Sequence, residues 1–242
     1  MYKYNGININ YKDYGNKNKT PIVYLHGWGQ NIKMMEPIAN PFQESNRLII
    51  IDLPGFGSSE DPDFAWTLEN YADMIHSLLD SLNIENPNLI GHSFGGKISL
   101  IYASKYKVNR MILLASPFKV KVKKLSWKVR LLKKMKKIPV LGKIADKIKS
   151  HMGSTDYRNA KPLMRDVLVK HVNTDLTEKV KSIKCPTFII WGDKDEAVPI
   201  EDAYELDNLL KDSGLTIYEG CTHYAYLERL AQTNAIIASF MK

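Results

Sequence analysis

The sequence contains only two cysteines, Cys185 and Cys221, among its 242 residues. Two thiols are too few for a disulfide framework. One precedes a predicted strand and the other follows the end of a different one, so we do not expect them to pair. Residues 1–6 also lack the apolar run of a secretory signal, and we therefore expect both cysteines to be reduced thiols in the cytoplasm.

Long hydrophobic runs are missing as well. The chain has no stretch of about 18 consecutive apolar residues, so it predicts no transmembrane segment. It has no internal repeat and no low-complexity linker. A hydrophobic fraction of 44% is ordinary for a globular protein, and 242 residues suffice for one domain with a sizeable core.

Acidic residues are nearly absent from residues 119–149. This segment holds thirteen basic residues and one acidic residue, Asp146, which gives it a net charge of +12 against +8 for the whole chain. The rest of the chain therefore carries −4. The high isoelectric point belongs to this segment rather than to the protein as a whole.

Two interpretations of the basic segment stay open. In the first, its lysines are solvated on amphipathic helices whose apolar faces cover the rest of the protein. In the second, the positive surface attracts an anionic partner, such as an acyl carrier protein, an acidic lipid surface or an anionic substrate. Nucleic acid is disfavoured, because no recognition motif accompanies the charge.

What the sequence does contain is an alternation of strand-like and helix-like stretches. Apolar runs predict buried strands at 21–25, 47–52, 88–91, 110–115, 186–191 and 215–218, and residues 8–14 alternate like a half-exposed strand. Helices are predicted at about 67–82 with Thr67 as N-cap, after Ser93, at about 201–211 and at about 226–240. This α/β pattern predicts a mostly parallel, doubly wound sheet with helices on both faces.

The alternation breaks between residues 117 and 180, where no convincing buried strand occurs. Apolar residues recur there at helical spacing in two groups, which are Leu125, Val129 and Leu132, and Leu141, Ile144, Ile148 and Met152. We therefore expect a core of residues 1–116 and 181–242. Residues 117–180 would be a lysine-rich helical cap, inserted between two strands of that core.

Residues 91–95 read Gly-His-Ser-Phe-Gly, a G-x-S-x-G motif, and Gly96 follows. The motif lies between a predicted strand and a predicted helix, which is the context of a nucleophile elbow. On such a tight turn the Ser93 hydroxyl would project from the backbone, and the small flanking residues permit close approach of neighbouring segments. The motif is short, so its meaning depends on a base and an acid elsewhere in the chain.

The other unusual loops also follow predicted strands, at 26–30, 52–59, 192–199 and 220–224. In a parallel sheet such loops share one edge, where function usually lies. A serine nucleophile needs a base, and His223 lies in one of these loops. His92 adjoins the serine too closely for its ring to reach that hydroxyl. We expect His92 and His26 to support the loops.

The loop at 192–199 offers three carboxylates as the acid that orients the base, which are Asp193, Asp195 and Glu196. The order along the chain is then serine, acid, histidine, as the nucleophile-elbow architecture requires. Asp52 is expected to serve hydrogen bonding in its own loop instead.

Five ordered motifs resemble the α/β-hydrolase superfamily over nearly the full length of the chain. They are His26-Gly27-Trp28-Gly29, Asp52-Leu53-Pro54-Gly55-Phe56-Gly57-Ser58-Ser59, Gly91-His92-Ser93-Phe94-Gly95-Gly96, Gly192-x-x-Asp195-x-x-Val198-Pro199 and Gly220-x-x-His223. The resemblance implies an α/β-hydrolase fold with Ser93 as nucleophile and His223 as general base. It implies Asp195, three residues after a glycine, as the triad acid rather than Asp193.

The resemblance also implies an oxyanion hole formed by the backbone N–H groups of Trp28 and Phe94. Such a catalytic triad needs no metal and no organic cofactor. Within the superfamily the chain resembles the carboxylesterases that cleave pimeloyl-carrier methyl esters in biotin synthesis, and more loosely the small meta-cleavage-product hydrolases. We therefore expect a serine esterase that cleaves a small-molecule carboxylic ester, with His26, Trp127 and Phe118 in the substrate pocket.

Two other classes of function stay open. The same triad could hydrolyse a C–C bond, transfer an acyl group or cleave a thioester. A non-catalytic receptor could also have kept the fold and its ligand pocket.

Overall fold

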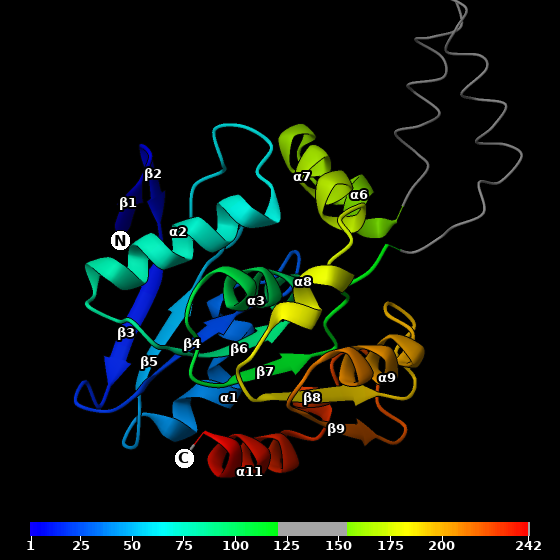
Figure 1. Ribbon diagram of the computed structural model, residues 1–242. Coiled ribbons are helices and arrows are strands. Elements are labelled where there is room, and N and C mark those ends of the chain that lie inside the picture. Colours follow the sequence, from blue (N-terminus) through cyan, green and yellow to red (C-terminus); the bar gives the residue numbers. More distant parts are fainter. Residues whose placement is uncertain (121–153, 242) are drawn as a thin grey trace, which may run out of the picture.

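The computed structural model describes residues 1–120 and 154–241 (Figure 1). Its centre is a seven-stranded sheet in the order β3-β5-β4-β6-β7-β8-β9. These strands are β3 (Tyr11–Gly15), β4 (Pro21–Leu25), β5 (Arg47–Ile51), β6 (Asn88–His92), β7 (Met111–Leu114), β8 (Thr187–Gly192) and β9 (Ser213–Tyr218). Only the edge strand β3 runs antiparallel to its neighbour within this sheet. The predicted mostly parallel sheet is confirmed.

Successive residues of the central strands enter two different cores. Val23 and Leu25 of β4 belong to the core under α2 (Leu68–Ser81) and α3 (Phe94–Lys105). Ile22 and Tyr24 belong to the core under α1 (Glu36–Ala39) and α11 (Leu230–Phe240). Because helices cover both faces, the strands are apolar on both sides, which is why they read as continuous apolar runs.

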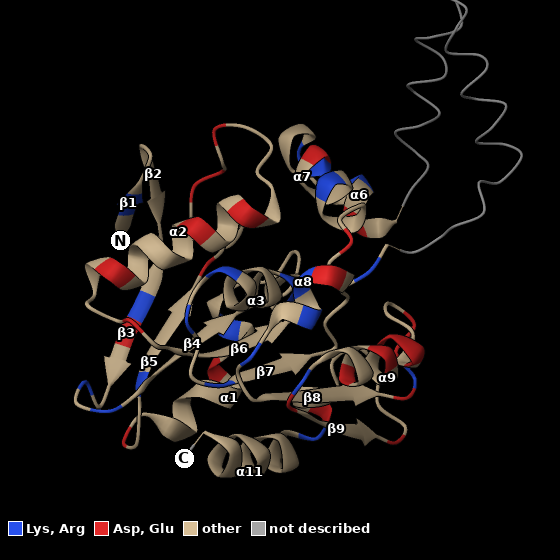
Figure 2. Cartoon of the chain, in the orientation of Figure 1, with Lys and Arg blue, Asp and Glu red and all other residues tan. Residues whose placement is uncertain are grey.

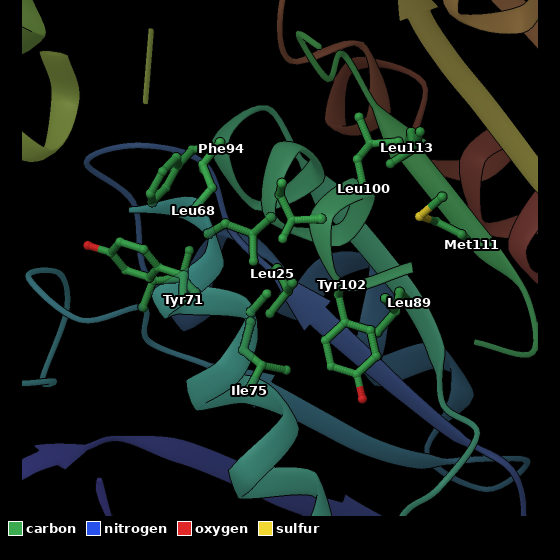
Figure 3. Close-up of a cluster of buried hydrophobic side chains, with 14 of the residues drawn as sticks. Leu25, Leu68, Tyr71, Ile75, Leu89, Phe94, Leu100, Tyr102, Met111 and Leu113 are labelled. Atoms are coloured by element: carbon green, nitrogen blue, oxygen red, sulfur yellow. The ribbon is translucent and has the colours of Figure 1, made fainter. Parts of the chain in front are cut away.

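Figure 3 shows part of the first core, where Leu25 and Leu89 from the sheet gather with Ile75 of α2 and Leu100 of α3. The remaining helical elements are η1 (Ile32–Met34), η2 (Asn40–Phe42), α6 (Thr155–Asn159), α7 (Pro162–Val172), α8 (Thr177–Ser182), α9 (Ile200–Leu209) and α10 (Ala225–Glu228). Cys185 and Cys221 are unpaired, as expected.

Helix α2 begins where its sequence predicts. Thr67 Oγ1 accepts a hydrogen bond from the Asn70 N–H, and Asn70 Oδ1 accepts one from the Thr67 N–H. This reciprocal capping box satisfies two N–H groups that the helix leaves without internal partners. A side-chain N-cap of this kind stabilises a helix by about 1 kcal/mol.

Two predicted elements are divided in the structure. The strand expected at 8–14 is split at Asn10 into β2 (Ile7–Ile9), which pairs with β1 (Tyr2–Tyr4), and β3. The reason is that the Asn10 backbone bonds to the loop after β5, through Ser59 Oγ and the Asp52 N–H, rather than to a strand. The last predicted helix is interrupted at Arg229, whose ψ of 49° is not helical.

Between β7 and β8, the residues that the structure describes form the helices α6, α7 and α8 (Figure 1). The predicted helical groups at 125–132 and 141–152, together with Trp127, lie outside the described residues. So does the whole basic segment except Lys119 and Val120. Over the rest of the described chain, acidic and basic residues are interspersed (Figure 2). The cap, its boundaries and its anionic partner stay predictions.

Among residues 1–120 and 154–241, no helix is both long enough and apolar enough to cross a membrane. The cytoplasmic location stays a prediction.

Candidate active site

The unusual loops meet at one edge of the sheet. Each follows the carboxyl end of a parallel strand: β4 ends at Leu25, β5 at Ile51, β6 at His92, β8 at Gly192 and β9 at Tyr218. Carboxyl ends of parallel strands lie on the same side of a sheet. The predicted convergence of these loops is therefore confirmed.

Ser93 occupies a strained turn between β6 and α3. Its φ is 50° and its ψ is −108°, a left-handed conformation that a residue with a side chain rarely adopts. Such backbone strain costs about 1–3 kcal/mol and persists only when the surroundings impose it. Here the Ser93 N–H donates to Leu114 O over 2.9 Å, and Ser93 O accepts from the Lys97 N–H over 3.0 Å. The half-buried serine thus has the backbone of a nucleophile elbow.

The glycines after Ser93 are required by close approach. A Cβ atom at Gly95 would lie 2.2 Å from Leu25 O, and one at Gly96 would lie 1.7 Å from Ser116 Oγ. Both distances are far below van der Waals contact. These positions allow the first turn of α3 to pack directly against the end of β4 and the segment after β7.

His223 and Asp195 form a hydrogen-bonded pair. His223 Nδ1 lies 2.7 Å from Asp195 Oδ2, and the Asp195 side chain has no exposed surface. The other oxygen, Oδ1, accepts from the N–H groups of Ala197 and Val198 over 2.8 Å each. With Nδ1–H donating to the carboxylate, the Nε2 lone pair of a neutral His223 is available to take a proton.

Asp193 has a different place. Its Oδ1 accepts from the Gly220 N–H over 2.7 Å, and its Oδ2 lies 3.4 Å from Lys194 Nζ. Glu196 is exposed. Of the three carboxylates in this loop, Asp195 is the one that contacts His223. It is also the residue that the family spacing implies as the triad acid.

The two residues expected to form an oxyanion hole lie side by side. The Trp28 and Phe94 rings are 5.3 Å apart with an interplanar angle of 76°. Phe94 is the first residue of α3, and a helix leaves its first N–H groups without internal partners. The Trp28 N–H makes no backbone hydrogen bond within the described residues. Neither N–H group thus has a backbone acceptor within the described residues, and their joint role as an oxyanion hole stays a prediction.

No hydrogen bond joins the Ser93 hydroxyl to His223 in the part of the chain that the structure describes. The two segments meet through His92 instead. His92 Nε2 lies 3.0 Å from His223 O, and the two imidazole rings are 4.8 Å apart. Catalytic hydrogen bonds are often long without substrate and tighten when it binds.

His26 and Asp52 hold the neighbouring loops together. The Leu53 N–H donates to His26 Nε2 over 3.0 Å, so the ring proton is on Nδ1, which donates to Gly27 O over 2.7 Å. Burial lowers the pKa of His26 to about 4, which keeps the ring neutral. Asp52 accepts from the N–H groups of Ile32 and Ser58. The expected loop-supporting roles of both residues are confirmed.

Three residues, His26, Phe118 and Trp127, are predicted to line the substrate pocket. His26 is fully buried with both ring nitrogens bonded to backbone groups. Phe118 is also fully buried, and its carbonyl accepts from the Leu176 N–H over 2.7 Å. Trp127 lies outside the described residues. The place of these three residues in a substrate pocket stays a prediction.

Two further side chains adjoin the site without any signal in the sequence. The His171 ring of α7 stacks on Trp28 at 6.1 Å and meets the Phe94 ring edge-on at 4.7 Å. Lys97 of α3 is 1% exposed and donates to His171 O over 2.9 Å and to Thr174 O over 2.6 Å. Burial lowers the pKa of Lys97 to about 8, and burial together with the Lys97 charge lowers the pKa of His171 to about 3. Both hydrogen bonds of Lys97 join residues more than 70 positions apart, so no local sequence pattern predicts them.

Known proteins resemble this chain in sequence and in fold. Residues 20–139 match the family described as alpha/beta hydrolase fold. The chain is 27% identical to the AB hydrolase superfamily protein YisY of Bacillus subtilis, with 91% of each chain covered. It is 29% identical to Lipase 1 of Psychrobacter immobilis over 94% of this chain and 78% of the lipase. A solved esterase from Exiguobacterium antarcticum has a TM-score of 0.77 at 24% identity, covering 97% of this chain and 96% of the esterase.

Proposed function

This chain has the α/β-hydrolase fold and belongs to the superfamily named for it, and on that premise we propose that it is a serine hydrolase cleaving a carboxylic ester. The observation that carries the proposal is the 2.7 Å contact between His223 Nδ1 and Asp195 Oδ2. This pair lies at the sheet edge where the strained turn presents Ser93. The order Ser93, Asp195, His223 is the one that this architecture uses.

In the first half of the reaction, Ser93 Oγ attacks the ester carbonyl carbon while His223 Nε2 takes the hydroxyl proton. Asp195 holds the ring and stabilises the imidazolium that forms. The negative charge moves to the carbonyl oxygen, which the N–H groups of Trp28 and Phe94 bind. Removing one such donor in another serine hydrolase costs about 3–4 kcal/mol of transition-state stabilisation.

Collapse of this intermediate breaks the bond between the acyl carbon and the alcohol oxygen. The imidazolium of His223 gives its proton to the leaving oxygen, so an alcohol departs and the acyl group stays on Ser93. In the second half, His223 takes a proton from water, and the resulting hydroxide attacks the acyl carbon to give a second oxyanion intermediate. The bond to Ser93 Oγ then breaks, and the His223 imidazolium returns its proton to that oxygen. The products are a carboxylic acid, an alcohol and the free serine.

The surroundings of the oxyanion residues support an apolar acyl group. The half-buried rings of Trp28 and Phe56 are 4.8 Å apart, and Phe94 lies 6.2 Å from Phe56. His171, whose buried ring is neutral, completes this group of aromatic side chains. Aromatic side chains bind an acyl chain by burying apolar area rather than by charge. Cleavage of a pimeloyl-carrier methyl ester remains the finer proposal, and it rests on the sequence motifs.

A substrate panel tests the proposal. It contains p-nitrophenyl esters of varied acyl length and charge, a methyl ester, an acyl thioester and a vinylogous diketone. We expect uncharged esters to be cleaved orders of magnitude faster than the diketone, and Ser93→Ala to abolish that turnover. Faster cleavage of the diketone would mean a C–C hydrolase. A protein inert toward the panel and toward a fluorophosphonate would be a receptor.

A further inference from the structure

His92 is buried where the turn of Ser93, the loop of His223 and the loop of Trp28 meet. It is the last residue of β6 and directly precedes Ser93, and its side chain has no exposed surface. Its Nε2 lies 3.0 Å from the backbone oxygen of His223. Its Nδ1 lies 3.2 Å from Gln30 Oε1. One ring therefore contacts the loop of the proposed base and the loop that carries Trp28.

The atom of Gln30 that faces His92 can be identified from its other hydrogen bond. Gln30 Oε1 accepts a hydrogen bond of 2.9 Å from the Gly27 N–H, which identifies this atom of the amide as the oxygen. A Cβ atom at Gly27 would lie 2.7 Å from His92 Nδ1, so the ring packs directly against the backbone of this loop. The residue after Gly27 is Trp28, one of the two proposed oxyanion donors.

Both ring nitrogens of His92 therefore face acceptor oxygens, although a neutral imidazole carries one N–H. Burial, with a smaller contribution from His223, lowers the pKa of His92 to about 3, so the ring is neutral at neutral pH. One of the two contacts must then lack a proton. The contact to His223 O is the shorter, at 3.0 Å against 3.2 Å, and we assign the proton to Nε2.

We propose that His92 is a positioning residue, which holds the backbone of His223 through an Nε2–H···O hydrogen bond and so aligns the base with Ser93. This inference rests on the proposed serine-hydrolase function. Its physical basis is that the hydrogen bond joins the residue next to the nucleophile to the residue that takes the proton. A misplacement of about 1 Å between such groups can cost about 100-fold in rate.

The neutral state of the His92 ring also favours the positive charge that His223 takes up during the reaction. The centroids of His92 and His223 are 4.8 Å apart, so a charged His92 would oppose formation of the His223 imidazolium. The ring packs in addition against Tyr226, at 4.8 Å, and Tyr224, at 5.5 Å. An aromatic substitute would therefore keep the packing and remove only the N–H.

A matched pair of substitutions separates the two contacts. The Gln amide nitrogen can take the place of the histidine Nε2, and the Asn amide nitrogen that of Nδ1. His92→Gln thus keeps a donor toward His223 O, whereas His92→Asn loses that donor and places one toward Gln30 Oε1 instead. His92→Phe removes the single N–H of the ring.

We expect kcat on a p-nitrophenyl ester to fall about 10- to 100-fold in His92→Asn and His92→Phe. It should stay within about threefold of wild type in His92→Gln, and KM should change little in all three. If His92→Asn is as active as His92→Gln or more so, or if all variants match wild type, the inference is overturned. If His92→Phe fails to fold, the comparison of Gln with Asn still decides. An inactive wild type would overturn the proposed function as well, and active variants beside an active wild type would overturn the inference alone.

Discussion

Asp195 accepts a hydrogen bond from His223 over 2.7 Å, although the two residues are 28 positions apart in the chain. The Asp195 side chain is withdrawn from solvent and also accepts from two backbone N–H groups. A carboxylate with three donors keeps a fixed orientation. It therefore holds both the ring orientation and the tautomer that the proposed mechanism requires of His223.

Asp195→Asn should reduce kcat by about 10²–10⁴-fold, because the amide removes the charge and favours the wrong tautomer of His223. Asp193→Asn is the matched control in the same loop. Its carboxylate contacts the Gly220 N–H and not His223, so kcat should fall less than about fivefold. The measurement is steady-state hydrolysis of a p-nitrophenyl ester. A larger loss in Asp193→Asn than in Asp195→Asn would contradict the assignment of the acid.

Gly95→Ala should destabilise the protein by about 1–3 kcal/mol and lower its esterase activity. The new Cβ would lie 2.2 Å from Leu25 O, so α3 must move away from β4, and the Phe94 N–H moves with it. Gly214→Ala is the control, since its nearest neighbours are 3.0 Å away on the flexible Phe188 side chain. Urea unfolding of both variants measures the two losses in the free energy of unfolding, and Gly95→Ala should lose more. Equal losses would mean that close packing at the turn is unimportant.

Lys97 should make stability depend on pH in the alkaline range. Its pKa is about 8 in the folded protein and about 10.5 in an unfolded chain, with burial as the main cause and the carboxylates of Asp175 and Asp202 opposing it. Between these values the unfolded chain binds more protons at this site, so the free energy of unfolding should rise with pH. In Lys97→Met this contribution is absent.

The test compares the free energy of unfolding of wild type and Lys97→Met between pH 7 and pH 10. Subtracting the variant cancels the titrating groups that do not interact with Lys97. His171, whose pKa the Lys97 charge helps to lower to about 3, stays neutral in folded wild type over this pH range. The stability of wild type relative to the variant should increase as pH rises through about 8. A constant difference, or one that decreases with pH, would show that Lys97 is not held with a lowered pKa.

The sequence was most informative where chemistry is local. The strand ends, the elbow at Ser93 and the loop positions of His223 and Asp195 all follow from short apolar runs and from the residues directly after them. The choice between Asp193 and Asp195 needed the spacing of the family, because periodicity does not show which carboxylate a turn directs toward a histidine.

Contacts between distant segments could not be predicted from the sequence. The buried Lys97 is surrounded by apolar residues in the sequence of α3, and its partners His171 O and Thr174 O lie on another helix and its following turn. The break at Asn10 likewise depends on hydrogen bonds to Ser59 and Asp52, more than 40 residues away. Such contacts depend on how the elements pack against one another. The alternation or helical spacing of apolar residues in the sequence does not predict them.

The most direct test of the proposed function is covalent labelling of Ser93. Purified protein is treated with a fluorophosphonate, digested and analysed by mass spectrometry, and ester hydrolysis is followed in parallel. We expect the probe to be attached to Ser93 in wild type, turnover to be lost in step with labelling, and Ser93→Ala to show neither labelling nor turnover. Undiminished ester hydrolysis by Ser93→Ala would contradict the proposed function.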